Sequence, residues 1–335
     1  MDKIITIAVD AMGGDNAPEA SVCGAVEAVK KFENIKVLLV GKENDIKSEL
    51  AKYSFPADKI EIRNATEVIV TGEPPVKSIR EKKDSSLVVA LKCVKDGEAD
   101  AIVTAGNTGS VLVGGQMIVR REKGVDRSPI GTAIPTEKGA ALLVDAGANV
   151  DARPEHLIQF AVMGQAYAEK VLNIDKPKVA LLNIGAEEEK GNALTKEVYT
   201  LLSERDDINF IGNIEGNEVS KGKADVIVAD GFAGNLVLKM YEGVASTMLK
   251  VIKETFMTST KTKIGAMLIK NEFKEQLKKF DVNRYGAAPL LGLRALVLKC
   301  HGNSKAESFT IAIGQSISFI EADLNSVIRD RINNL

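Results

Sequence analysis

The chain lacks tryptophan, and aromatic residues make up only 4% of its 335 positions. A core of ordinary size must therefore be built from valine, isoleucine, leucine and alanine, which suits the buried strands of a parallel sheet. The three cysteines, Cys23, Cys93 and Cys300, are too few and too scattered for a disulfide framework, so we expect a reducing compartment. No apolar run reaches the roughly 20 residues needed to span a bilayer.

Histidine is almost as scarce. The chain has only His156 and His301, too few for an ordinary zinc site. His156 follows Pro154 in the first turn of an expected helix, and we interpret it as a surface residue. The sequence also has no P-loop, no dinucleotide fingerprint and no nucleophile elbow. These absences favour direct transfer between bound substrates, without a metal or another cofactor, over a covalent enzyme intermediate.

Charge of either sign is not in excess. Forty-four lysines and arginines nearly cancel 46 aspartates and glutamates, for a formal net charge of −2. Nucleic acid is therefore not an expected partner, and any basic binding surface must be local.

What is present is an alternation of short aliphatic runs with longer segments of helical period. This alternation predicts one large α/β domain over residues 1–335, with a doubly wound, mostly parallel sheet. The expected strands are Ile4–Val9, Lys36–Val40, Ile60–Arg63, Ala101–Thr104, Gly131–Pro135, Ala141–Val144, Val179–Leu182, Ile208–Gly212, Val226–Ala229 and Leu296–Lys299. The expected helices include Pro18–Phe32, Ser86–Lys95, Pro154–Val171, Glu188–Glu204 and Ala306–Ile332.

Residues 244–280 break this alternation, because two helical segments are joined there by the polar stretch Thr258–Lys263 with no strand between them. We expect an inserted helical hairpin that projects from the sheet. Ile264, Met267 and Leu268 form an apolar stripe on it, with several lysines nearby. Such a surface is suited to packing against a second subunit or to inserting into an anionic membrane, and both interpretations stay open.

Glycine, asparagine and aspartate follow six of the expected strands. In open α/β sheets ligands bind beyond the carboxyl ends of the strands, and glycine-rich turns that lead into helices favour anions. We therefore predict an anion-binding crevice there. Two of its loops echo each other, ADAIVTAGNTGSVLV at residues 99–113 and ADVIVADGFAGNLVL at residues 224–238.

The loops supply the candidate site residues. We assign substrate binding to Asp10, Gly13, Gly14, Asp15, Asn107, Thr108, Gly109, Ser110, Asn149, Gly231, Gly234 and His301. We assign catalytic roles to Lys190, Asp230, Asn235 and Lys239. A simpler interpretation stays open for several of them: the aspartates, Asn107, Thr108 and Ser110 could cap turns or helices, and both lysines could point into solvent.

Long segments in this order resemble a known family. They are DAMGGDNAP at 10–18, AGNTGS at 105–110, VDAGAN at 144–149, LLNIGAEEEKGN at 181–192, GNIEGNE at 212–218, DGFAGNLVLK at 230–239, YGAAPLLGL at 285–293 and KCHGNS at 299–304. The pattern resembles the bacterial phosphate acyltransferases of phospholipid synthesis, and the resemblance spans essentially the whole chain.

The resemblance implies a reaction in which the fatty acyl thioester of acyl carrier protein reacts with inorganic phosphate to give acyl phosphate and free carrier protein. Orienting the phosphate and stabilising the oxyanion would supply most of the catalysis, because a thiolate of pKa near ~8.5 is a good leaving group. The implied fold is similar to that of isocitrate and isopropylmalate dehydrogenases and of phosphotransacetylases.

The resemblance also implies a homodimer in the cytoplasm, peripherally attached to the inner face of the cell membrane, where a membrane glycerol-phosphate acyltransferase would receive the product. The basic patch Arg120, Arg121, Lys123 and Arg127 would then dock the acidic carrier protein, unless it only complements a helix C-terminus. Two other functions remain as alternatives: a metal- and NAD-dependent decarboxylating dehydrogenase on the same fold, and a non-catalytic membrane scaffold for lipid-synthesis enzymes.

Overall fold

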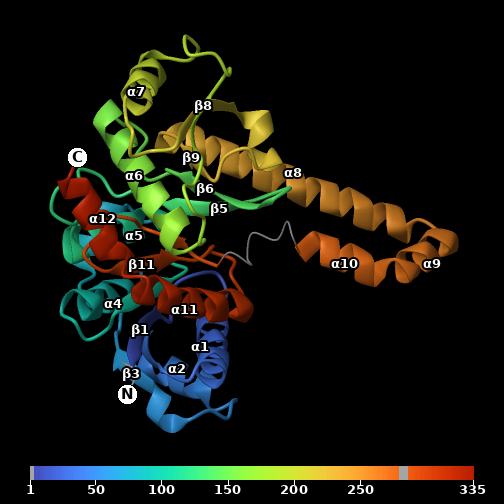
Figure 1. The fold of residues 1–335 in the computed structure, drawn as a ribbon. Helices are drawn as coiled ribbons and strands as arrows, with labels where there is room; N and C mark the ends of the chain where they lie inside the picture. The colour runs from blue at the N-terminus through green and yellow to red at the C-terminus, as the bar shows by residue number, and fades with distance from the viewer. Residues whose placement is uncertain (1–3, 279–285) are drawn as a thin grey trace.

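The structure, a computed structural model, describes residues 4–278 and 286–335. Its strands form two sheets (Figure 1). The six-stranded sheet has the order β10 (Ala288–Pro289), β11 (Leu296–Lys299), β4 (Ala101–Thr104), β1 (Ile5–Asp10), β2 (Ile35–Gly41) and β3 (Ile60–Asn64). The five-stranded sheet has the order β5 (Gly131–Thr136), β6 (Gly139–Val144), β9 (Val226–Val228), β7 (Val179–Asn183) and β8 (Phe210–Glu215).

The prediction of one sheet is therefore wrong, although the mostly parallel α/β class is confirmed. The strand pairs are parallel except β10 with β11 and β5 with β6. The antiparallel pair β5–β6 is possible because only a two-residue turn joins its strands, whereas a parallel pair needs a long crossover. Every expected strand is present, and β8 is shifted the most, since it runs to Glu215 rather than Gly212. The short strand β10 was not predicted.

Successive residues of the central strands point to opposite faces, so each sheet contributes to two hydrophobic cores. Ile7 and Val144 belong to the core that α1 (Glu19–Lys31), α6 (Pro154–Lys170), α7 (Ala193–Ser203), α11 (Ala306–Glu321) and α12 (Leu324–Asn333) help to form. Ala8 and Leu143 belong to the other core, which includes residues of α3 (Pro75–Glu81), α4 (Ser86–Lys95) and α5 (Thr108–Gly114). The remaining short elements are α2 (Glu43–Leu50), two 3₁₀ turns (Ala57–Lys59 and Gly216–Lys221) and a π-helical turn (Gly115–Val119).

Three local expectations need correction. The helix expected over Ala306–Ile332 is two helices, because the chain turns at Asp323, whose φ of 48° is left-handed. The helix expected from Glu188 begins only at Ala193, where the Asn192 side chain accepts the Thr195 backbone N–H at 2.9 Å. His156 is buried rather than on the surface, and its Nδ1 accepts the Arg153 backbone N–H at 3.1 Å.

The segment after β9 consists of three helices rather than two. The long helix α8 (Gly231–Met257) starts next to the sheets and extends beyond them, and α9 (Thr260–Leu268) and α10 (Lys270–Lys278) follow at its far end (Figure 1). Most of the expected linker Thr258–Lys263 is the first turn of α9, capped by Ser259, which accepts the Thr262 N–H at 3.2 Å. Residues 279 and 280 of the predicted insertion lie outside the described residues. None of the described helices is long and apolar enough to span a membrane.

Candidate active site

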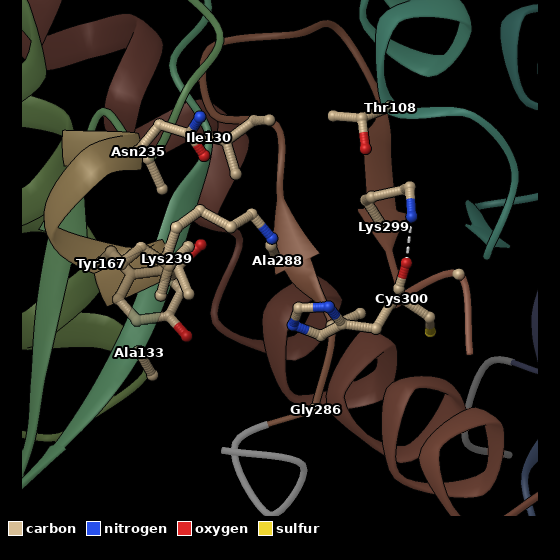
Figure 2. A pocket seen from close by; sticks show the side chains of 16 residues that line it. Thr108, Ile130, Ala133, Tyr167, Asn235, Lys239, Gly286, Ala288, Lys299 and Cys300 are labelled. Atoms are coloured by element: carbon tan, nitrogen blue, oxygen red, sulfur yellow. Dashed lines mark hydrogen bonds between the residues drawn. The ribbon is translucent and has the colours of Figure 1, made fainter. Parts of the chain in front are cut away.

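A cavity of about 250 Å³ lies where the carboxyl end of β11 faces the first turns of α8 (Figure 2). One wall carries Lys299 and Thr108, and the opposite wall carries Asn235 and Lys239. Both sheets therefore contribute to the cavity. The other residues that line it are Ile130, Thr132, Ala133, Ala146, Tyr167, Leu238, Gly286, Ala287, Ala288, Cys300, His301 and Gly302.

Four of the predicted site residues, Thr108, Asn235, Lys239 and His301, line this cavity together. The loop after β1 lies behind it and supports the wall. The Asp15 backbone N–H donates to the Gly302 carbonyl at 2.7 Å. Gly14 has a φ of +99°, and an added Cβ there would lie 2.9 Å from the same carbonyl oxygen, so this position requires glycine.

Asp10 is a buried brace between two strand ends. Its Oδ2 accepts the Thr104 hydroxyl at 2.7 Å, and its Oδ1 accepts the Met12 N–H at 3.3 Å. Burial raises the pKa of this carboxyl group, while the hydrogen bonds from Ser86 and Thr104 oppose the shift. Gly13 must remain small, because an added Cβ would lie 2.5 Å from Asp10 Oδ2. Neither residue lines the cavity.

At the start of α5 the capping interpretation holds for Asn107, whose side chain accepts the Ser110 backbone N–H at 3.0 Å. Ser110 is fully buried. Gly109 faces α3, where an added Cβ would lie 2.6 Å from Pro75 Cγ. Of the four residues assigned to substrate binding here, the structure brings only Thr108 into the cavity wall.

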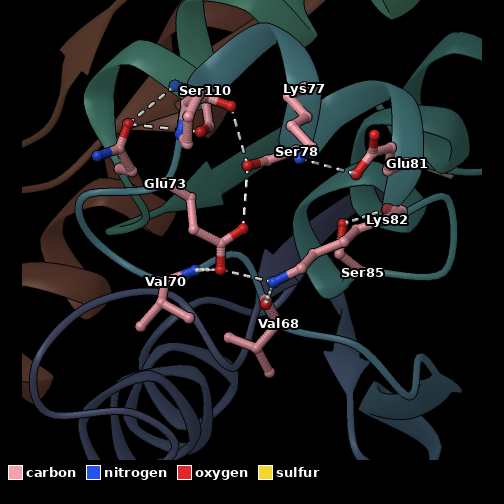
Figure 3. A network of polar contacts seen from close by, with 11 residues as sticks. Val68, Val70, Glu73, Lys77, Ser78, Glu81, Lys82, Ser85 and Ser110 are labelled. Atoms are coloured by element: carbon pink, nitrogen blue, oxygen red, sulfur yellow. Dashed lines mark hydrogen bonds and ion pairs between the residues drawn. The ribbon is translucent and has the colours of Figure 1, made fainter.

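The loop that leads into α3 is held by its own polar network (Figure 3). Glu73 accepts the Val70 N–H at 3.1 Å, the Ser78 hydroxyl at 3.0 Å and the Lys82 ammonium at 2.6 Å. These bonds lower the pKa of Glu73. The same bonds hold the start of α3 in place. Gly109 packs against this segment, which helps to position its neighbour Thr108 in the cavity wall.

The loop 145–149 is the support of α8. The buried Asp145 carboxylate accepts the backbone N–H groups of residues 130, 147, 148 and 149 and the Asn149 side chain, at 2.7–3.1 Å. The Gly231 N–H donates to the Asn149 carbonyl at 2.8 Å. An added Cβ at Gly234 would lie only 1.9 Å from the Asp145 carbonyl oxygen. These glycines and Asn149 thus bring α8 close to the loop, and none of them lines the cavity.

Asp230 is the N-cap of α8. Its Oδ1 accepts the backbone N–H groups of Phe232 and Ala233, both at 2.9 Å. Because the carboxylate occupies the two free donors, the helix N-terminus does not present them to another anion. The structure places Asp230 as the anchor of the helix that carries Asn235 and Lys239.

Lys299 is the main residue that the sequence analysis missed. Its side chain is 9% exposed, and its Nζ donates to the Cys300 carbonyl. In the described part of the chain no carboxylate lies within ion-pair distance of this ammonium. Burial lowers the pKa of Lys299 to about 8. The sequence does contain a signal for it, because a lysine at the end of an apolar strand that faces the crevice is unusual.

Glu242, also missed, lies between two cavity residues, Lys239 and His301. Its Oε2 is 3.3 Å from Lys239 Nζ, and its Oε1 is 3.3 Å from His301 Nε2. Burial lowers the pKa of His301, Glu242 raises it, and Lys299 and Lys239 lower it further. The neighbouring Cys300 is a buried thiol whose pKa burial raises to about 12, which makes it a poor nucleophile.

The remaining predicted residues lie away from the cavity wall. Lys190 is exposed on the loop after β7, where its carbonyl accepts the Asn183 side chain at 3.2 Å. The exposed patch Arg120, Arg121, Lys123 and Arg127 lies near the amino end of β11, where the Arg294 N–H donates to the Arg120 carbonyl at 3.0 Å. Ile264, Met267 and Leu268 are exposed on α9. Among the residues described, no three His, Cys, Asp or Glu side chains come together where they could hold a metal ion.

Comparison with known proteins agrees with this architecture. A family model described as "Fatty acid synthesis protein" matches residues 5–327. A phosphate acyltransferase of Alkaliphilus oremlandii is 48% identical over 329 residues, which cover 98% of each chain. A phosphate acyltransferase of Clostridium acetobutylicum is 46% identical over 329 residues, which cover 98% of this chain and 99% of its own.

Two solved structures share the fold. A phosphotransacetylase from Streptococcus pyogenes has a TM-score of 0.64 at 18% identity and covers 96% of this chain and 95% of its own. The EutD phosphotransacetylase from Staphylococcus aureus has a TM-score of 0.57 at 17% identity, covering 95% and 93%. The expected likeness to phosphotransacetylases is thus confirmed for the fold. Since the family model and the curated relatives match nearly the whole chain, the protein belongs to the phosphate acyltransferases, the acyltransferases of fatty acid and phospholipid synthesis.

Proposed function

We propose that this enzyme transfers a fatty acyl group from the thioester of acyl carrier protein to inorganic phosphate and releases acyl phosphate for phospholipid synthesis. The observation that carries the proposal is the pair of lysines on opposite walls of one cavity, Lys299 beyond β11 and Lys239 on α8.

Phosphate is the ligand that fits this pair. A buried ammonium without a carboxylate partner is costly, and a bound anion removes much of that cost. Lys299 is such a group, whereas Lys239 is 60% exposed and lies at the cavity mouth. The Thr108 hydroxyl and the Asn235 amide can donate further hydrogen bonds to phosphate oxygens.

The proposed chemistry needs no covalent enzyme intermediate. A phosphate oxygen attacks the thioester carbonyl carbon, the C–S bond breaks, and the proton of hydrogen phosphate ends on the released thiol. Charge develops on the carbonyl oxygen in the transition state, where the lysine ammonium groups can stabilise it. The apolar part of the lining, including Ile130, Ala133 and Leu238, would hold the acyl carbons next to the thioester.

The surfaces outside the cavity suit the proposed partners. The four cations at 120, 121, 123 and 127 are exposed and form no ion pair within the described residues, so they can dock an acidic carrier protein. On α8 an exposed apolar row, Phe232, Leu236, Met240, Val244 and Met248, recurs every four residues, which suits a homodimer contact.

We further propose that α9 attaches the enzyme to the inner face of the membrane, near the membrane glycerol-phosphate acyltransferase that would take the product. Ile264, Met267 and Leu268 are 52%, 70% and 77% exposed. Lysines at positions 261, 263, 270 and 274 accompany them, a combination that suits an anionic lipid surface.

The deciding experiment incubates the enzyme with acyl carrier protein carrying a palmitoyl thioester, with and without inorganic phosphate, in the presence of a metal chelator and without NAD. We expect phosphate-dependent release of carrier-protein thiol and an equal amount of acyl phosphate, trapped with hydroxylamine. Thiol release without phosphate would indicate a thioesterase instead. In a parallel assay with a divalent metal and NAD, reduction of NAD by a hydroxy acid would support the dehydrogenase, and liposome binding without turnover in either assay would support the scaffold.

A further inference from the structure

Glu242 is an unexpected group in an anion site. It projects from α8 one turn after Lys239, with 24% of its side chain exposed, and it lies within 3.3 Å of both Lys239 and His301. A carboxylate here repels phosphate and weakens its binding. Its presence at the cavity therefore calls for a role other than holding the anion.

The geometry at His301 indicates that role. Glu242 Oε1 is buried and accepts no hydrogen bond within the described residues, and His301 Nε2 lies 3.3 Å from it, so a proton on this ring nitrogen would satisfy it. A carboxylate at one ring nitrogen selects the tautomer that carries its proton there, and the other nitrogen, Nδ1, is then free to accept a proton. The 3.3 Å separation is long for a hydrogen bond, but such contacts commonly tighten in the reacting complex.

We propose that Glu242 is a positioning residue that holds the Nε2 proton of His301, so that Nδ1 can carry a proton from the attacking phosphate to the departing thiolate. This inference rests on the proposed function. In the reaction, hydrogen phosphate loses its proton to Nδ1 as its oxygen bonds to the carbonyl carbon. When the C–S bond breaks, the imidazolium returns that proton to the sulfur, and His301 is neutral again.

The charges around His301 suit a base of this kind. Lys239 from α8 and Lys299 from β11 face it together with Glu242, and the two lysines and burial keep the ring neutral and able to accept a proton. Glu242 supplies the opposite charge that stabilises the imidazolium once it forms. Without Glu242 the pKa of His301 falls, so the ring remains neutral to lower pH but becomes a weaker base.

The test compares Glu242→Gln with Glu254→Gln, which removes a carboxylate from an exposed Lys–Glu pair on the same helix. For Glu242→Gln we expect kcat to fall about tenfold or more, because general base catalysis by a histidine contributes on the order of 100-fold. The KM for phosphate should not rise, and the ascending limb of the kcat–pH profile should move to lower pH. Glu254→Gln should change neither quantity.

A double-mutant cycle separates positioning from a purely structural role. If Glu242 acts through His301, Glu242→Gln should lower kcat no further in a His301→Gln background, and Glu242→Asp should restore part of the activity. Imidazole ¹⁵N NMR should show the proton on Nε2, and assignment is simple in a chain with two histidines. Additive losses, an unchanged kcat or a proton on Nδ1 would overturn the inference. If any of these results appears while the wild type still shows phosphate-dependent transfer, only the inference about Glu242 fails. If the wild type shows no such transfer, the proposed function fails as well.

Discussion

If phosphate binds beside Lys299 as proposed, the charge of this lysine should make phosphate binding dependent on pH. Its pKa is about 8 in the folded protein, below the ordinary lysine value, so the ammonium is charged below that pH and neutral above it. We expect the KM for phosphate to be low near neutral pH and to rise as the pH increases through 8. Steady-state kinetics at constant ionic strength across this range would measure the rise, and a flat profile would show that Lys299 does not contact the anion.

Removing the same side chain should weaken catalysis strongly. For Lys299→Met we expect a loss of ~3 kcal/mol of transition-state stabilisation, about 100-fold in kcat/KM for phosphate, because an oxyanion donor is lost. The fold should persist, since methionine fills a similar volume without burying a charge. Lys170→Met, an exposed position at the end of α6, is the matched control. An equal kcat/KM for phosphate in both variants would show that Lys299 does not belong to the active site.

Two glycines in neighbouring helices should respond to alanine in opposite ways. At Gly234 the new methyl group would lie 1.9 Å from the Asp145 carbonyl oxygen, whereas at Gly265 nothing lies within 4 Å. Gly234→Ala should lower the free energy of unfolding by ~1–3 kcal/mol and reduce activity, because α8 must shift. Gly265→Ala should raise the free energy of unfolding by up to ~1 kcal/mol, because alanine has a higher helix propensity than glycine. Urea unfolding measures both changes.

For Asn107 and Asp230 the sequence analysis assigned site roles and left capping open, and the structure supports the local alternative. Asn107 and Asp230 cap the helices that follow them, and the capping interpretation was visible in the spacing. The burial of Lys299 is not a local property, because β11 lies between β4 and β10, and its pairing with β4 joins segments far apart in the chain. Lys190 illustrates the opposite error, since its glycine and asparagine neighbours serve the cap of α7 and not the cavity.

At the level of the elements, variants of Asp230 can show whether this predicted catalytic residue affects activity only by capping α8. Because its carboxylate caps α8, Asp230→Asn should retain the cap and most of the activity. Asp230→Ala should cost ~1 kcal/mol of stability and lower the activity as the first turn of α8 loosens. Thermal unfolding and kcat of both variants distinguish the two roles. A severe loss of kcat in a stable Asp230→Asn variant would mean that the carboxylate takes part in the chemistry.

The element α9 should govern membrane attachment. Burying Ile264, Met267 and Leu268 in lipid could contribute ~1.5–3 kcal/mol each, and neighbouring lysines ~1 kcal/mol each on an anionic surface. We expect the double variant Ile264→Glu and Leu268→Glu to lose co-sedimentation with anionic liposomes while its activity in solution persists. The control is Leu201→Glu, an exposed position on α7. Retained liposome binding would contradict the proposal, and loss of a dimer instead would assign these side chains to a subunit interface.

Strand positions were predictable because hydrophobic alternation is a local property of the sequence. The division into two sheets was not, because it depends on which strands pair. The expected strands over Gly131–Pro135 and Ala141–Val144 are an antiparallel pair at the edge of a separate sheet, and nothing in their composition distinguishes them from parallel neighbours. The long α8 was also divided wrongly, since Gly231 and Gly234 were interpreted as loop residues although they begin the helix.

For the whole molecule, phosphate should stabilise both halves at once, because one cavity lysine lies on β11 of the six-stranded sheet and the other on α8, which packs on the loop after β6 of the five-stranded sheet. At a concentration 100 times the dissociation constant, a ligand that binds only the folded state adds ~2.7 kcal/mol. We therefore expect phosphate to raise the Tm of the wild type in calorimetry, compared with chloride at equal ionic strength. The increase should be smaller in Lys239→Met or Lys299→Met and absent in the double variant. An equal increase in all of them would place the bound anion elsewhere.

The helix α8 has a geometric consequence for the molecule as a whole. Its 27 residues span roughly 40 Å at 1.5 Å per residue, from the loop that carries Asp145 to the start of α9. Residues at fixed spacing on one helix keep a fixed angle about its axis. The exposed apolar face of Phe232, Leu236 and Met240 therefore keeps a fixed angle, around the helix axis, to the cavity residues Asn235 and Lys239. A membrane or a protein that binds the exposed face of this helix therefore also fixes the direction in which the cavity opens.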